Sequence, residues 1–181
     1  MFTCENVTLR PMELDDIELF YTWEYDIELS LNSGWVPVVS HEAFRERYGR
    51  RISDPNPNQK LFVIVFEGRL VGYIQLARID KEAGMAAIGI VVGEKQLQGR
   101  GIGSMALRIM LDFAFKVVNL ERVYAEVFGF NLRSQRMMER VGFVKEGILR
   151  QHEVHNGARQ DMHFYGILKP EFYQKYETIF K

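Results

Sequence analysis

The sequence predicts a mixed α+β fold in which one central sheet contains a single parallel crossover. Three observations predict it. Short apolar segments alternate with polar turns between residues 61 and 92, as in an antiparallel meander. A long amphipathic helix pattern then covers residues 102–117, and a further strand pattern begins at Val123. A strand, a helix and a strand of these lengths form a parallel, right-handed unit.

The bulk properties predict one domain over residues 1–181, because this length suits one well-buried core. The net charge of −1 argues against a nucleic-acid partner. Cys4 is the only cysteine, so no internal disulfide can form, and this favours a reducing compartment. Cys4 also lies at an end of the chain that we expect to fray. Residues 1–6 lack a signal-peptide pattern, and no apolar run approaches the ~20 residues that cross a membrane. We therefore expect a cytoplasmic protein with no membrane partner.

The chain before the meander predicts one strand and several helices. Pro11 stops the first strand, and Ser40 is a suitable N-cap for the last helix. The expected elements are a strand over residues 7–10, a helix from Asp15, a helix end with a loop and a short second helix within residues 23–34, a helix over residues 41–48 and a loop over residues 54–58.

The remaining elements follow from turn signals and apolar periodicity. Asn156-Gly157 is a strong hairpin turn, and Gly142 is a suitable residue to end a helix. The expected elements are strands over residues 61–66, 70–79, 85–92 and 123–127, helices over residues 102–117 and 131–142, strands over residues 143–149 and 158–168, and a final helix over residues 170–180.

Glycines at positions 99, 101 and 103 lie between the strand that ends at residue 92 and the helix that follows. Such a loop lets a phosphate approach bare backbone N–H groups at a helix N-terminus. The nucleoside-triphosphate motif GxxxxGK[ST] is not matched. Residues 101–106 match the dinucleotide pattern GxGxx[GA], but residues 93–100 separate these glycines from the strand and a meander precedes them. The third candidate ligand is the pyrophosphate of coenzyme A.

The segment Gln98-Gly99-Arg100-Gly101-Ile102-Gly103 matches the acyl-CoA signature Q/R-x-x-G-x-G/A of GNAT-type N-acetyltransferases. The likeness covers nearly the whole chain in the expected order, so the sequence is identified as a member of that superfamily. Further matching positions resemble its RimJ/RimL branch: residues 7–11, Asn131, Ser134, residues 138–143, Gly147, Leu149-Arg150, Asn156-Gly157, Asp161, Tyr165, Leu168 and Glu171-Phe172. The resemblance implies a mixed central sheet with a splayed parallel strand pair and flanking helices.

The resemblance also implies acetyl-CoA as the acyl donor. The strand over residues 123–127 would splay away from its neighbour and open a slot for the thioester, whose oxyanion the backbone amide of Val92 would stabilise. Asn131 would hydrogen-bond the pantetheine arm, although its position also suits an N-cap. The implied donor-binding residues are Ile90, Val91, Val92, Gln98, Gly99, Arg100, Gly101, Ile102, Gly103, Ser104, Asn131, Ser134 and Met138. The alternative for Gly101 and Gly103 is helix–strand packing.

The family's usual proton-transfer groups are absent. Ala87 stands where many members carry a glutamate base, and Met138 stands where many carry a tyrosine acid. Deprotonating a lysine-like amine at pH 7 costs roughly 4–5 kcal/mol, whereas an α-amine costs only about 1 kcal/mol. The sequence therefore favours a peptide α-amine or another weakly basic amine. Glu126 and Tyr124 are the candidate catalytic replacements, with Tyr165, His152 and a water relay as further alternatives.

Acidic and aromatic side chains gather where the family builds its acceptor pocket, which suits a cationic amine; the alternative is a solvated helix end. The candidate substrate-binding residues are Trp23, Glu24, Tyr25, Glu28 and Trp35. The four histidines are scattered, which predicts no metal site. We expect acetyl transfer to a primary amine of a peptide or small molecule, in a possible homodimer. The alternatives are a catalytically weak or inactive acyl-CoA-binding or sensing protein and, third, a dinucleotide binder.

Overall fold

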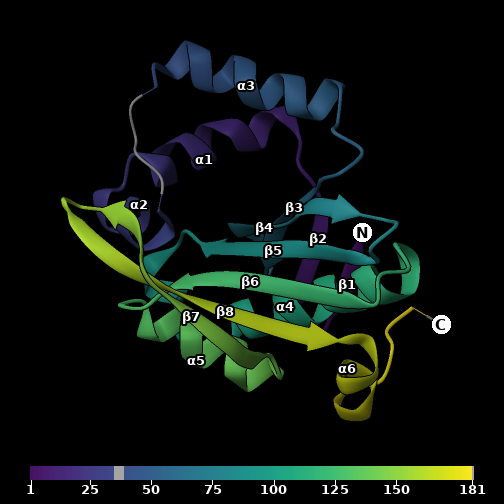
Figure 1. Ribbon diagram of the computed structural model, residues 1–181. Coiled ribbons are helices and arrows are strands. Elements are labelled where there is room, and N and C mark those ends of the chain that lie inside the picture. The colour runs from purple at the N-terminus through teal and green to yellow at the C-terminus, as the bar shows by residue number, and fades with distance from the viewer. Residues whose placement is uncertain (35–38, 181) are drawn as a thin grey trace.

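The computed structural model describes residues 1–34 and 39–180. These residues form one eight-stranded sheet in the order β1-β2-β3-β4-β5-β6-β8-β7 (Figure 1). Every neighbouring pair is antiparallel except β5 and β6, which are parallel. The strands are β1 (Phe2–Cys4), β2 (Val7–Pro11), β3 (Lys60–Phe66), β4 (Arg69–Asp80), β5 (Met85–Val92), β6 (Arg122–Phe128), β7 (Val144–His155) and β8 (Ala158–Leu168). The predicted mixed α+β class is confirmed.

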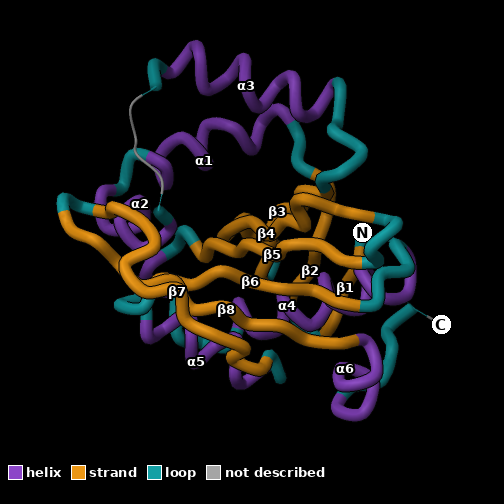
Figure 2. Tube along the Cα trace, viewed as in Figure 1, coloured by secondary structure: helices purple, strands orange, loops and turns teal. Residues whose placement is uncertain are grey.

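Helices cover both faces of the sheet. Figures 1 and 2 show α1, α2 and α3 on one face, with α4 and α5 on the other. The helices are α1 (Ile17–Glu24), α2 (Ile27–Ser33), α3 (His41–Ser53), α4 (Ile102–Asp112), α5 (Leu132–Val141) and α6 (Lys169–Lys175), with short turns η1 (Leu14–Asp16), η2 (Lys95–Leu97) and the π-helical η3 (Phe113–Val117). None of these helices is long and apolar enough to cross a membrane.

Two apolar clusters hold these layers together, one on each face of the sheet. Strand residues alternate between them, because successive side chains of a strand point to opposite faces. On β5, for example, Ile88 packs with the α4 cluster while Val91 packs with the α1 and α3 cluster. The face beneath α4 and α5 therefore differs chemically from the face beneath α1 and α3.

The parallel pair β5 and β6 separates after a short contact. The two strands pair only through Met85, Ala86 and Ala87 of β5. Beyond this point β5 stays paired with β4 as far as Val92, and β6 stays paired with β8 as far as Phe128. The sheet therefore divides into two parts at one end and leaves a slot between them. The splayed strand pair that the resemblance implied is confirmed.

Several element bounds differ from the sequence prediction for identifiable reasons. The N-terminus does not fray, because the Phe2 ring packs against Phe62, Phe113 and Phe180 and residues 2–4 become a strand. Pro11 lies inside β2 at its end and pairs with Phe62. The terminal helix stops at Lys175, because buried Asp112 accepts hydrogen bonds from the following segment.

Helix α3 runs to Ser53, five residues beyond the predicted end at Tyr48. Its buried side chains Phe44 and Tyr48 are followed at the same spacing by Ile52, which packs against the same cluster. The apolar face therefore continues for one more turn. Ser40 accepts a hydrogen bond from the amide of Ala43, so the predicted N-cap is confirmed.

Candidate active site

The glycine loop brings an exposed helix N-terminus to the open end of the slot. Gly99 and Gly101 have φ of +81° and +86°, a left-handed backbone conformation that residues with a Cβ rarely adopt. Nothing lies within 4 Å of the position where a Cβ would stand at either glycine. Helix α4 begins immediately after Gly101, so its first N–H groups lack acceptors within the helix. Open space beside these amides fits a pyrophosphate.

Gly103 has a different role from the two glycines before it. A Cβ at Gly103 would lie 2.7 Å from the Met137 sulfur, 3.7 Å from Val92 and 3.8 Å from Ile90. Helix α4 therefore approaches both α5 and β5 at this position only because a hydrogen atom replaces the side chain. Gly103 therefore has the helix–strand packing role that the sequence left as an alternative.

Two amide side chains fasten the open end of the slot. Gln98 donates to the backbone oxygen of Val92 at 2.8 Å and accepts a hydrogen bond from Arg133, so it connects the end of β5 with the first turn of α5. Asn131 accepts a hydrogen bond from the amide of Ser134 at 3.0 Å, as an N-cap does, and donates to the backbone oxygen of Asn32 at 3.1 Å. Arg133 was not expected from the sequence, since its partner is distant along the chain.

Ser134 and Met138 lie one turn apart on α5. Ser134 is partly exposed, whereas Met138 is 3 % exposed and packs in the cluster beneath α4 and α5. A thioether offers no proton to a leaving thiolate. Tyr165 is also buried, and its hydroxyl lies 3.1 Å from Glu139; burial raises the pKa of Tyr165 to about 12.

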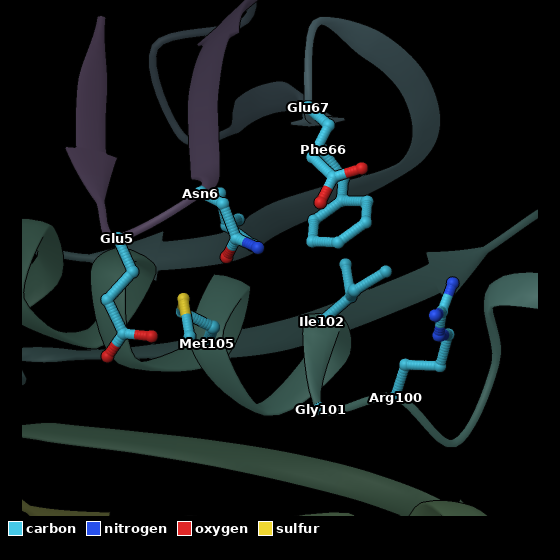
Figure 3. Close-up of a pocket in the computed structure, with 9 residues that line it drawn as sticks. Glu5, Asn6, Phe66, Glu67, Arg100, Gly101, Ile102 and Met105 are labelled. Atoms are coloured by element: carbon cyan, nitrogen blue, oxygen red, sulfur yellow. The ribbon is translucent and has the colours of Figure 1, made fainter.

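A pocket of about 370 Å³ lies beside Arg100 (Figure 3). It is formed by the turns that precede β2 and follow β3 together with the start of α4. Its lining residues are Glu5, Asn6, Val7, Phe66, Glu67, Arg100, Gly101, Ile102 and Met105. The residues of the slot, 90–92, do not line it. Arg100 therefore lines this pocket together with Gly101 and Ile102 of the glycine loop and helix start.

The face of the sheet toward α1 and α3 carries the candidate catalytic side chains. Ala87, Gly89 and Tyr124 are partly exposed there, next to the slot. Glu126 lies on the same strand face as Tyr124, and its carboxylate pairs with the Arg78 guanidinium at 2.9 Å. The side-chain hydrogen bond to Tyr124 and the charge of Glu126 raise the pKa of Arg78. The two candidate catalytic residues, Glu126 and Tyr124, therefore share Arg78 as a cationic partner.

Arg78 could not be expected from the sequence. It occupies an irregular position in β4, with φ of +51°, where the pairing register with β5 shifts. This irregularity carries the side chain across the sheet toward β6. No local pattern signals a contact between two residues on strands that are not neighbours.

Two of the candidate substrate-binding residues lie at the end of α1. Trp23 is buried over Gly93, where a Cβ would lie 2.1 Å from its ring. Glu24 is 8 % exposed and accepts hydrogen bonds from Arg47 and Tyr48, each at 3.2 Å. Burial, and the nearby charge of Glu24, raise the pKa of Tyr48 to about 12. Glu24 therefore connects α1 to α3. Its carboxylate is neither solvated, as at an exposed helix end, nor open to an acceptor.

The other candidate acceptor residues lie nearer the surface. Tyr25 is exposed and donates a hydrogen bond to the backbone oxygen of Val39. Glu28 is exposed and pairs with Lys95 at 2.8 Å, and Asp26 pairs with the same lysine at 2.8 Å. Trp35 lies outside the described residues. Within residues 1–34 and 39–180, no three His, Cys, Asp or Glu side chains gather as metal ligands would.

Comparisons with known proteins agree with this geometry. Residues 6–144 match the family model of the acetyltransferase (GNAT) domain. The chain is 30% identical to the putative ribosomal N-acetyltransferase YdaF of Bacillus subtilis (strain 168), over 95% of this chain and 98% of that one. It is 28% identical to the uncharacterized N-acetyltransferase p20 of Bacillus licheniformis, over 93% of this chain and 96% of that one.

A solved structure extends the likeness to three dimensions. Spermidine N-acetyltransferase from Vibrio cholerae, in complex with CoA and spermine, superposes with a TM-score of 0.85 and 25% identity. The superposition covers 93% of this chain and 98% of that one. The family match over more than half of the chain, the splayed strand pair and the glycine loop agree: the chain belongs to the GNAT family and is an acetyl-CoA-dependent N-acetyltransferase.

Proposed function

We propose that the protein transfers the acetyl group of acetyl-CoA to the primary amine of a peptide or small molecule, by direct attack of the amine on the thioester. The observation that carries this proposal is the slot between β5 and β6, which opens beside the bare N-terminus of α4. The backbone edges of both strands are unpaired in the slot, so an extended acyl-pantetheine arm can pair there as a strand would.

The donor-binding residues follow from this placement. Residues 90–92 line the slot from β5 and would contact the pantetheine arm, which Asn131 and Ser134 approach from α5. The amides of residues 98–104 would hold the pyrophosphate. The backbone amide of Val92 would stabilise the oxyanion, because Gln98 fixes the end of this strand by its hydrogen bond to the Val92 oxygen.

The acceptor amine would react in its neutral form. As it attacks, a nitrogen–carbon bond forms to the acetyl carbon, the carbon–sulfur bond breaks and the CoA sulfur leaves as a thiolate; the amine loses one proton to water. The carboxylate of Glu126 is held by Arg78 and does not need to take part. For an α-amine, the neutral form costs only about 1 kcal/mol at pH 7, against roughly 4–5 kcal/mol for a lysine-like amine.

A second candidate function is an acyl-CoA-binding or sensing protein with weak or no catalysis. The observation that favours it is the chemistry of two positions: Ala87 has no carboxylate, and Met138 is buried and has no hydroxyl. Such a protein would hold the donor in the same slot without consuming it.

Release of the free CoA thiol from acetyl-CoA separates the two functions. The assay uses a panel of peptides, spermidine, aminosugars and aminoglycosides, each with and without the protein. We expect thiol release that depends on an added amine. CoA binding in an isothermal titration, with no thiol released by any amine of the panel, would instead support the sensing protein. Spermidine belongs in the panel because two relatives named spermidine N(1)-acetyltransferases, from Vibrio cholerae and Escherichia coli, are 27% and 26% identical to this chain.

The assembly is also proposed as a homodimer, which the resemblance implies. A related Vibrio cholerae spermidine N-acetyltransferase has a dodecameric structure. Light scattering after gel filtration measures the mass directly; twice the chain mass of 21.2 kDa is expected.

A further inference from the structure

The sheet face beneath α1 and α3 has a floor of small and amide side chains next to the slot. Gln75 of β4 lies opposite Gly89 of β5, and Ala77 lies opposite Ala87. All four residues are partly exposed and share one face of the sheet. An acceptor whose amine reaches the slot from this face therefore passes over the floor that these residues form.

The carboxylates beside this floor are already neutralised by arginines of the same chain. Glu24 pairs with Arg47 at 3.2 Å, and Glu126 pairs with Arg78 at 2.9 Å. Neither acid is free to attract a cationic acceptor. Of three guanidinium groups near this floor, those of Arg47 and Arg78 each pair with a carboxylate, and that of Arg51 donates to Gln75 instead.

Arg51 is the guanidinium that lacks a carboxylate partner among the described residues. It projects from α3, and its guanidinium donates to the Gln75 side-chain oxygen at 3.1 Å while lying 5.2 Å from the centre of the Tyr48 ring. Gln59 donates to the same oxygen at 2.9 Å. Within residues 1–34 and 39–180, no carboxylate oxygen lies within 4.0 Å of this guanidinium. A partly buried arginine that is fixed by an amide and a ring, with donors left over, is suited to a carboxylate or a phosphate.

The distance from Arg51 to the reacting centre limits the acceptor. The Gln75 amide lies over Gly89, 3.7 Å from the position of a Cβ there. Gly89 precedes Val92 by three residues, and Val92 carries the proposed oxyanion amide. At about 3.3 Å per strand residue, the anion site lies roughly 7–10 Å from the amine. Two to three extended peptide residues span that distance.

We infer that Arg51 and Gln75 form a subsite for an anionic group of the acceptor, a carboxylate or a phosphate that lies about two residues from the primary amine. The subsite rests on the proposed acetyl transfer and names its substrate class. It favours peptides with an acidic residue behind the N-terminal α-amine. It disfavours polyamines, because their second ammonium group would face the Arg51 guanidinium.

The test compares acceptors that share one amine. The probes are the peptide amides Ala-Glu-Ala, Ala-phosphoserine-Ala and Ala-Gln-Ala, with spermidine as the cationic acceptor. For the wild-type enzyme, we expect kcat/KM to be at least about 10-fold higher for one or both anionic peptides than for Ala-Gln-Ala, and lowest for spermidine. The two anionic peptides separate a carboxylate ligand from a phosphate ligand.

Substitution of the arginine identifies the residue. Arg51→Gln should remove the preference, which is a loss of about 10–100-fold for the anionic peptides, mainly through KM, with Ala-Gln-Ala unchanged within about twofold. Arg51→Lys should keep part of the preference, because it keeps the charge without the planar fork. Arg50→Gln is the matched control: its side chain is 72 % exposed on the same helix and pairs with Glu46, so the preference should not change.

Each other outcome has a definite meaning. Equal rates for all three peptides in the wild type, or a preference for spermidine, would overturn the subsite while leaving acetyl transfer intact. An equal loss on all peptides in Arg51→Gln would show that Arg51 only supports the floor. If Arg51→Gln does not fold, an undiminished preference in Arg51→Lys decides against the subsite. No thiol release with any amine would refute acetyl transfer and the subsite together.

Discussion

Gly101 is the residue where backbone conformation and the proposed ligand contact can be separated. Substitution by glutamate places a Cβ in open space, so the fold has room for the side chain. The left-handed backbone should lower the free energy of unfolding by about 1–2 kcal/mol. The added carboxylate would stand where the pyrophosphate is expected, so we predict that Gly101→Glu abolishes CoA binding in an isothermal titration.

Gly157→Glu is the control for this substitution. Gly157 has φ of +73°, also with nothing within 4 Å of a Cβ, but it lies in the turn between β7 and β8. It should show a similar loss of stability with unchanged CoA affinity. If Gly101→Glu binds CoA as the wild type does, the pyrophosphate does not lie on this loop.

Ala87 has no carboxylate and Glu126 is paired with Arg78, and these two facts predict how kcat/KM depends on pH. If no side chain acts as the base, kcat/KM should rise with pH until the acceptor amine itself is neutral. The rise should level off near pH 8 for an α-amine and continue toward pH 10 for a lysine-like amine. Glu126→Gln and Tyr124→Phe should each lower kcat/KM by less than about 10-fold and leave these profiles in place.

The contrary result is equally clear. Glu126 would be the general base if both acceptors gave the same apparent pKa and Glu126→Gln removed it. The same substitution would then lower kcat/KM by more than about 100-fold.

Local patterns predicted a set of donor-binding residues, part of which the structure brings together, and failed for side chains held by distant partners. The order of Gln98, the glycines and Asn131 is a local signal, and the structure brings them together at one end of the slot. The pairing of Glu126 with Arg78 depends on a register shift in β4, which no pattern in the sequence marks.

At the scale of elements, helix α1 packs against the end of β5 through Trp23 and Gly93. Because a Cβ at Gly93 would stand 2.1 Å from the Trp23 ring, Gly93→Ala should destabilise the wild type by about 2–3 kcal/mol. In a Trp23→Leu background the clash is removed, and the same substitution should cost less than about 1 kcal/mol. Urea unfolding of the four proteins measures the coupling.

Gly147→Ala controls for the loss of a glycine without a clash, since nothing lies within 4 Å of a Cβ there. It should change stability by less than about 1 kcal/mol. Additive effects of Gly93→Ala and Trp23→Leu would show that α1 does not press on this glycine.

Asn131 is the N-cap of α5 and is proposed to contact the pantetheine arm, so its two roles can be separated by one pair of variants. Asn131→Ala should lower the free energy of unfolding by about 1 kcal/mol, because it removes the cap on Ser134. Asn131→Ser keeps a capping oxygen and should lose only a few tenths of a kcal/mol. We predict that both variants raise the KM for acetyl-CoA, since serine cannot reach as the amide does. An unchanged KM in Asn131→Ser would leave Asn131 as a cap alone.

The sequence predicts which helices and strands exist better than it predicts where they end. The meander, the helix after the glycine loop and the final hairpin carry their own periodicity or turn signals, and they were predicted correctly. The strand at Phe2 and the end of α6 depend on contacts with Phe113 and Asp112, which are distant in sequence. Such ends are fixed by tertiary packing and cannot be predicted from a local window.

At the scale of the whole molecule, the division of the sheet creates the site. Strands β1 to β5 form one part and β6, β8 and β7 the other, and strand pairing joins the two parts through the first residues of β5 alone. The crossover through α4 returns the chain beside β5 and places the glycine loop at the open end. The sequence predicts this topology, because a parallel pair needs such a crossover. The charges on the acceptor face come from α1, α3, β4 and β6, so they emerge only after folding.

A crystal structure with CoA bound tests the central claim, that the donor occupies the slot between β5 and β6. We predict the pyrophosphate on the amides of residues 99–104, the pantetheine arm beside residues 90–92 and the thioester beside the backbone amide of Val92, with no side-chain base within reach. Phosphates in the pocket between Glu5, Glu67 and Arg100, with the slot between β5 and β6 empty, would contradict it.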